Sequence, residues 1–117
     1  MLLSGFNHVA ILTNDTDRLC TFYRQVFEAE VTESPEPAEA GAPRLTFIRV
    51  GHTAELNVFG FEGNTEADRQ TPMFGRGRID HLALQAASLE TFEELRRRLM
   101  ERMKPRGTRA ARYPAAA

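Results

Sequence analysis

A strand-and-helix pattern occurs twice in this sequence, and the repeat constrains the fold more than any other feature. The segment FNHVAI at residues 6–11 matches IDHLAL at residues 79–84. In the same ungapped register, the apolar positions of the following helix also match: Leu19, Phe22, Val26 and Phe27 fall on Phe92, Leu95, Leu99 and Met100. Because histidine, alanine and the helical phase agree together, chance is a poor explanation. The sequence therefore predicts two related modules.

The composition is that of an ordinary folded protein. The chain has 117 residues, 42% of them hydrophobic and 26% charged, which suits one domain with a real core. A formal net charge of −1 gives no basic excess, so we expect no nucleic acid and no anionic membrane as a partner. No apolar run approaches the roughly 20 residues of a membrane span, and no signal-like segment opens the chain. The only cysteine, Cys20, excludes an intrachain disulfide, and a cytoplasmic location is the default expectation.

The first module, residues 5–61, is predicted to be βαβββ, which makes the fold class α+β. Residues 6–13 are β-branched and apolar and are expected to form a buried strand. A capping sequence, Asn14-Asp15-Thr16, then precedes a helix of about three turns. A short strand is expected at 29–34, and alternating patterns predict two more strands, 44–50 and 54–61, that form a hairpin.

The remainder is predicted to be a linker, part of a second module and a tail. Residues 62–77 are polar and rich in turn formers, as surface linkers are. A strand at 78–86 and a helix opened by Ser88 form an incomplete second module, of β and α only, so that one domain covers residues 1–103. Arg, Ala and Pro dominate 104–117, and we expect an irregular or disordered tail there.

His8 and His81 occupy equivalent positions of the repeat. Alternate side chains of a strand share a face, so each histidine lies opposite the aliphatic face that would pack on the following helix. An approximate twofold between the modules would bring the two imidazoles into one cleft, where they could bind a divalent metal. The alternative is that each is a half-buried strand residue without a ligand. His52 has no counterpart in the repeat and is expected at the surface.

An oxygen donor is expected from the last strand of the first module, where Glu55 and Asn57 share a face. Glu55 is the stronger ligand because it is anionic, whereas the Asn57 carbonyl is a neutral donor to a hard cation. The alternative is that these are solvent-facing polar positions. Cys20 has no histidine near it in sequence and is expected to be an inert thiol.

The segments at 6–31, 54–59 and 78–99 resemble the vicinal oxygen chelate superfamily, which includes glyoxalase I, extradiol dioxygenases, methylmalonyl-CoA epimerase and the bleomycin and fosfomycin resistance proteins. The resemblance implies paired glyoxalase-like βαβββ modules that curve into a cleft, often completed as a dimer. It implies metal ligands on the first and last strands of each module. His8 and His81 take the first-strand positions, and Asn57 takes the last-strand position of the first module, with Glu55 as the alternative. The later strands of the second module, one of which usually supplies a glutamate ligand, have no counterpart here.

Three functions follow from the resemblance. The first is an enzyme of lyase, isomerase or dioxygenase type, in which a divalent ion (Ni²⁺, Mn²⁺, Fe²⁺ or Zn²⁺) chelates a small substrate through neighbouring oxygens and stabilises an anionic intermediate. The second is a metal-free, antibiotic-type protein that binds a small molecule. The third is an inactive, truncated scaffold. We expect a homodimer, because an open sheet edge needs covering; no general base is identified.

Overall fold

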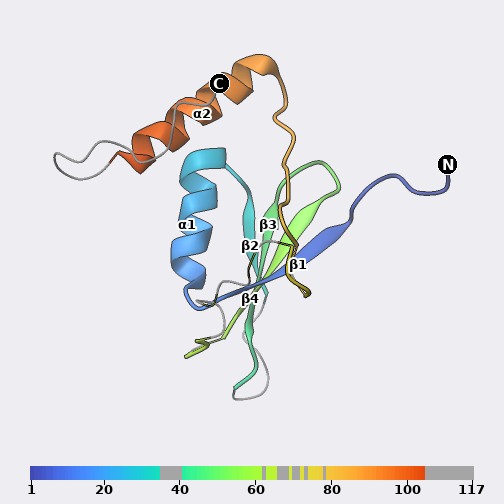
Figure 1. Cartoon of the computed structure of the whole chain (residues 1–117), viewed down its shortest axis with the longest axis vertical. Coiled ribbons are helices and arrows are strands. Elements are labelled where there is room, and N and C mark those ends of the chain that lie inside the picture. Colours follow the sequence, from blue (N-terminus) through green and yellow to red (C-terminus); the bar gives the residue numbers. More distant parts are fainter. Residues whose placement is uncertain are drawn as a thin grey trace. The chain divides into compact units, whose positions relative to one another are not determined.

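The computed structural model describes residues 1–34, 41–61, 63–65, 69, 72, 74–77 and 79–104. The chain divides into two compact units, Met1–Leu84 and Gln85–Ala117. The first unit contains β1 (His8–Thr13), α1 (Thr16–Phe27), β2 (Val31–Glu33), β3 (Arg44–Arg49) and β4 (Glu55–Gly60), and the second contains α2 (Leu89–Met103), as Figure 1 shows. The predicted βαβββ order and the later helix are confirmed.

The four strands form one mixed sheet in the order β1-β4-β3-β2. β1 runs parallel to β4, with His8 opposite Glu55 and Thr13 opposite Gly60. β3 is antiparallel to both β4 and β2. The first and last strands of the module are therefore direct neighbours, and residues that are far apart in the sequence come together on them.

The core lies between α1 and the face of the sheet that the helix covers (Figure 1). Its buried side chains come from the helix and the two inner strands: Cys20, Ile48, Leu56 and Val58. Val9 and Ile11 of β1 pack against this cluster, while His8 on the same strand is exposed. The predicted division of β1 into an aliphatic face and a histidine face is confirmed.

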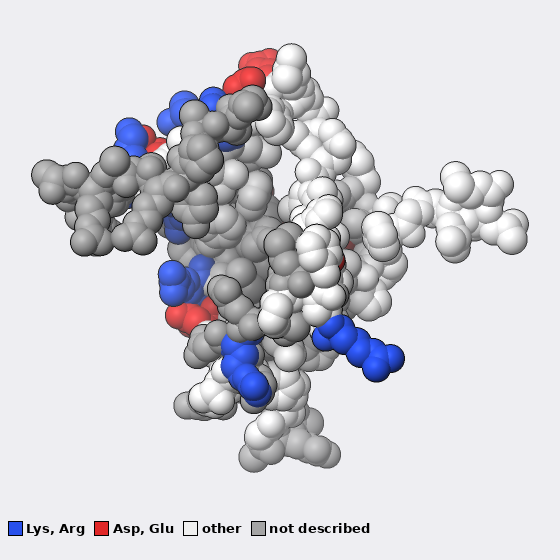
Figure 2. All heavy atoms as spheres, viewed as in Figure 1, with Lys and Arg blue, Asp and Glu red and all other residues white. Residues whose placement is uncertain are grey.

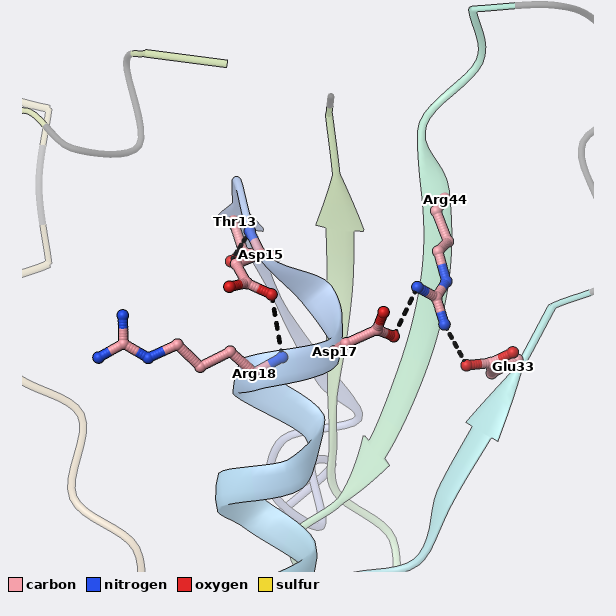
Figure 3. A network of polar contacts seen from close by, with 6 residues as sticks. All are labelled: Thr13, Asp15, Asp17, Arg18, Glu33 and Arg44. Carbon is pink, nitrogen blue, oxygen red and sulfur yellow. Dashed lines mark hydrogen bonds and ion pairs between the residues drawn. The ribbon is translucent and has the colours of Figure 1, made fainter. Parts of the chain in front are cut away.

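Asp15, one of the three residues of the predicted capping sequence, is the N-cap of α1. Its Oδ1 accepts a hydrogen bond from the backbone N–H of Arg18 at 3.0 Å, and its own N–H donates to Thr13 Oγ1 at 3.0 Å (Figure 3). These bonds satisfy polar backbone groups at the turn between β1 and α1. At the other end, Glu28 adopts a left-handed conformation with φ of 53°, and its N–H donates to the Arg24 carbonyl. Both ends of the helix are thus fixed locally.

Arg44 ties the helix to two strands. Its Nη1 donates to Asp17 Oδ1 on α1 at 2.8 Å, and its Nη2 donates to Glu33 on β2 (Figure 3). The hydrogen bonds to Asp17 and Glu33 raise the pKa of the Arg44 guanidinium. The side chain is half-exposed, so this network holds the elements in position more than it adds stability.

Gly60, the last residue of β4, sits against the start of α1. A Cβ atom built on Gly60 would lie 2.1 Å from Thr16 Oγ1, far inside van der Waals contact. Thr16 is itself buried. The helix can therefore approach the sheet this closely only because position 60 carries no side chain.

Residues 79–86 form no strand, contrary to the sequence-based expectation for 78–86; Arg78 lies outside the described residues. Alternation alone favours a strand here, but a strand also needs a partner for its backbone hydrogen bonds. In the described part of the sheet, β1 pairs with β4 alone, and residues 79–84 add no ladder to it. The segment is mostly exposed.

Ser88 is the N-cap of α2, as predicted, and its Oγ accepts a hydrogen bond from the Thr91 N–H at 3.0 Å. Glu94 accepts from both Arg97 and Arg98, each at 2.8 Å. The first of these bonds contributes most to lowering the pKa of the Glu94 carboxyl to about 2. No helix in the described part of the chain is long and apolar enough to cross a membrane.

The predicted linker and tail are described only in part. The described residues of 62–77 contain neither helix nor strand. Of the predicted tail, only Lys104 is described, and residues 105–117 lie outside the described residues.

Candidate metal centre

His8 and Glu55 lie opposite each other at the first positions of β1 and β4. Paired residues on neighbouring strands project to the same face, and neighbouring strands are about 4.8 Å apart. This is the face of the sheet that α1 leaves uncovered, since Leu56, the next residue along β4, is in the core. One imidazole and one carboxylate are therefore brought together by the sheet register.

Asn57 lies two residues further along β4 on the same face, opposite Ala10 of β1 and Phe47 of β3. The residue is half-buried, and its Oδ1 is buried without a hydrogen-bond partner in the described part of the chain. A buried carbonyl oxygen without a donor costs folding free energy. The same oxygen is a suitable ligand for a divalent cation.

The ring of His8 is held by the residue before it. His8 Nδ1 lies 2.7 Å from Asn7 Oδ1. An amide oxygen only accepts hydrogen bonds, so this contact fits a ring that carries a proton on Nδ1. Asn7 was not among the site residues predicted from the sequence. The signal that could have identified it is that a polar residue precedes the histidine in both copies of the repeat, Asn7 in one and Asp80 in the other.

Arg49 of β3 lies opposite Glu55 on its other side, so that His8, Glu55 and Arg49 form one row across three strands. Arg49 Nη1 donates to the His52 carbonyl at 3.0 Å, and its Nε lies 3.7 Å from Glu30 Oε2. Arg49 was also not predicted as a site residue from the sequence, because its position beside Glu55 depends on the register of the hairpin. His52 is exposed, as expected.

His81 is exposed, in the segment that forms no strand. Beside it, Asp80 Oδ1 accepts from the Phe74 backbone N–H at 2.8 Å. Among the described residues, no three His, Cys, Asp or Glu side chains come close enough together to hold a metal ion. His8, Glu55 and His81 therefore do not form such a group. Of the four predicted ligands, the structure thus places His8, Glu55 and Asn57 on one face of adjacent strands and does not group His81 with them.

The side chains on this face are of types that bind divalent metal ions. An imidazole nitrogen, a carboxylate and an amide oxygen are all ligands that first-row divalent metals accept. The observation in favour is the Asn57 Oδ1, which has no hydrogen-bond partner among the described residues and would gain one from a bound ion. Cys20 is not part of this arrangement: it is buried on the helix side, and burial raises the pKa of its thiol.

Apolar side chains continue the same face toward the far ends of the strands. Leu12 of β1 is exposed there, beside half-buried Phe59 of β4 and Leu45 of β3. The face therefore combines polar donors at one end with an apolar surface at the other, which is the usual make-up of a small-molecule site.

The family model of the Glyoxalase/Bleomycin resistance protein/Dioxygenase superfamily matches residues 5–110. The chain belongs to this superfamily, known also as the vicinal oxygen chelate superfamily. Among solved structures, the chain is similar to the crystal structure of SMU.1112c, with 20% identity, a TM-score of 0.49, and coverage of 85% of this chain and 74% of that one. No curated protein matches the sequence.

Proposed function

We propose that this protein is a divalent-metal-dependent member of the superfamily that acts on a small substrate with neighbouring oxygen atoms, as a lyase, isomerase or dioxygenase. The observation that carries the proposal is the position of His8 directly opposite Glu55 on the face of the sheet opposite α1. Superfamily membership supports the chemistry. A divalent ion, when bound, would supply Lewis-acid polarisation of the substrate oxygens.

In this proposal, His8 contributes Nε2 and Glu55 contributes its carboxylate. Glu55 takes precedence over Asn57 because it is anionic and is the register partner of His8. Asn57 adds a neutral oxygen from the next position on the same face. Leu12 and Phe59 would contact the less polar part of the substrate.

The test is metal analysis of protein loaded separately with Ni²⁺, Mn²⁺, Fe²⁺ and Zn²⁺ and then freed of excess ion. We expect stoichiometric retention of at least one of these metals by the parent and loss of it in His8→Ala and Glu55→Gln. His52→Ala is the matched control, because His52 lies in the turn that leads into β4 and is exposed. A parent protein that retains none of the four metals would rule the proposal out.

A second candidate function is metal-free binding of a small apolar molecule. It is favoured by the apolar part of the same face, where Leu12 is exposed beside half-buried Phe59. If the protein has this second function, metal should have no effect on the binding of the apolar molecule, and Leu12→Asn should weaken that binding. Binding of an apolar fluorescent dye, measured with and without metal and in His8→Ala, distinguishes the two functions.

The proposal also includes a homodimer, in which His81 of one chain supplies the second imidazole to the site of the other. β1 is an edge strand in the described part of the sheet, and the residues before it include exposed apolar side chains, Leu2, Leu3 and Phe6. Both features support association at this edge. Figure 2 shows this N-terminal segment projecting as uncharged side chains only. Sedimentation at several protein concentrations tests the homodimer, and we expect a dimer. Metal affinity, measured at the same concentrations, should depend on His81 only where the dimer forms.

A further inference from the structure

Asn7 makes two contacts that link it to both His8 and Glu55. Its side-chain Oδ1 accepts from His8 Nδ1 at 2.7 Å. Its backbone carbonyl accepts from the Glu55 N–H at 3.1 Å. The backbone bond fixes Asn7 against the start of β4, so its side chain acts on the His8 ring from a held position.

We propose that Asn7 is a positioning residue that selects the Nδ1–H tautomer of His8 and turns Nε2 toward the face of the sheet opposite α1. The inference rests on the proposed metal function. A ring nitrogen that donates to an outer partner leaves the other nitrogen as the metal ligand, with its lone pair in a fixed direction. His8 is exposed, and an exposed neutral imidazole in water favours the opposite tautomer, with the proton on Nε2. The bond to Asn7 is therefore needed for His8 to present Nε2 as an acceptor in most molecules.

Backbone geometry explains why this neighbour can reach the ring. Within a strand, consecutive side chains point to opposite faces. Asn7 precedes the first residue of β1, and the 2.7 Å contact of its Oδ1 with His8 Nδ1 places its side chain beside the ring and not on the helix side. Val9, the neighbour of His8 on the other side in sequence, lies within the strand and packs on the helix side with the core.

The tautomer is read directly from the metal-free protein by long-range ¹H–¹⁵N correlation spectra at about pH 8.5, where an ordinary imidazole is neutral. In the parent we expect a protonated Nδ1 and an unprotonated Nε2 for His8, while His52 in the same spectrum serves as the reference for an exposed ring. Asn7→Ala should shift His8 to the pattern of His52. Asn7→Asp keeps an acceptor oxygen and should preserve the parent pattern, and Asn14→Ala, at the other end of β1, should leave it unchanged.

Zn²⁺ binding is measured on the same variants. Asn7→Ala should weaken affinity about 10–100-fold, the usual effect of losing an outer-shell partner, and Asn7→Asp should restore most of it. A parent His8 with the proton on Nε2, or an Asn7→Ala variant with an unchanged tautomer, would overturn the inference whatever the metal result. A parent with the expected tautomer and no Zn²⁺ binding would instead uphold the hydrogen-bond assignment and overturn the proposed function.

Discussion

His8 and Glu55 are register partners on the parallel pair β1 and β4, although 46 residues of chain separate them in sequence. The register decides which side chains meet. A shift by one residue would turn Glu55 to the helix side and bring Leu56 to the face opposite α1. The core prevents that shift, because Leu56 and Val58 are buried against α1. The position of the candidate ligands is thus fixed by the packing behind them.

Glu55 should matter more than Asn57 for metal affinity. Glu55→Gln replaces an anionic donor by a neutral one beside His8, whereas Asn57→Ala removes a donor that is already neutral. We expect Zn²⁺ affinity, measured by competition with a coloured chelator, to fall further in Glu55→Gln than in Asn57→Ala. The reverse order would assign the main oxygen ligand to Asn57.

Gly60→Ala should destabilise the protein by roughly 1–3 kcal/mol, the usual cost of overpacking. The new methyl would lie 2.1 Å from Thr16 Oγ1 and force α1 away from β4. Urea unfolding monitored by circular dichroism gives the free energy of unfolding. Gly51→Ala is the control, because its nearest neighbour, the Ala54 Cβ, would be 3.8 Å away. Adding Thr16→Ala to Gly60→Ala should recover part of the loss, and no recovery would place the cause elsewhere.

Thr46→Val should stabilise the protein by about 1 kcal/mol. Thr46 is fully buried, and its Oγ1 has no hydrogen-bond partner in the described part of the chain. Valine keeps the β-branched shape and removes the desolvated hydroxyl. The same change at Thr32, which is exposed on β2, is the comparison and should have a smaller effect on the urea midpoint. A lower midpoint for Thr46→Val would show that the hydroxyl has a partner.

Glu94 should titrate well below an ordinary glutamate. Its pKa is lowered to about 2, first by the hydrogen bond from Arg97 and then by that from Arg98. A carboxyl with a lowered folded-state pKa favours the folded helix above its unfolded pKa of about 4.3, and this contribution is lost as the pH falls toward 2. Carboxyl carbon shifts in a ¹³C titration check the midpoint. Arg97→Gln should raise it, and a parent midpoint near 4.3 would contradict the hydrogen-bonded arrangement.

The elements of this fold were largely predictable from local sequence. Apolar and alternating patterns predicted every strand of the first module. The capping sequence Asn14-Asp15-Thr16 predicted where α1 starts, and Ser88 was predicted to open the later helix. The predicted ends of the strands differ from the observed ends by a residue or two. This happens where the apolar pattern continues past the last hydrogen bond of the strand pair, as at Phe6, which precedes β1. Local pattern sufficed because each of these signals lies within the element it specifies.

The candidate site was predictable only in part. Residue type and alternation identified His8, Glu55 and Asn57 as sharing suitable faces, but the choice between the last two depends on strand register, which alternation does not set. Segment 79–86 has the pattern of a strand and forms none, since a strand also needs a partner. The contact of Gly60 with Thr16 and the bond of Asn7 to His8 likewise arise from tertiary placement.

The most direct measurement is a double-mutant cycle on Zn²⁺ affinity with His8→Gln, Glu55→Gln and the two combined. If both side chains hold one ion, each single change should weaken binding by more than about tenfold, because even an outer partner is worth about 10–100-fold. The combined change should then cost less than the product of the two, since the first loss already disables the site. Parent-like affinity in either single variant would contradict a metal site at His8 and Glu55.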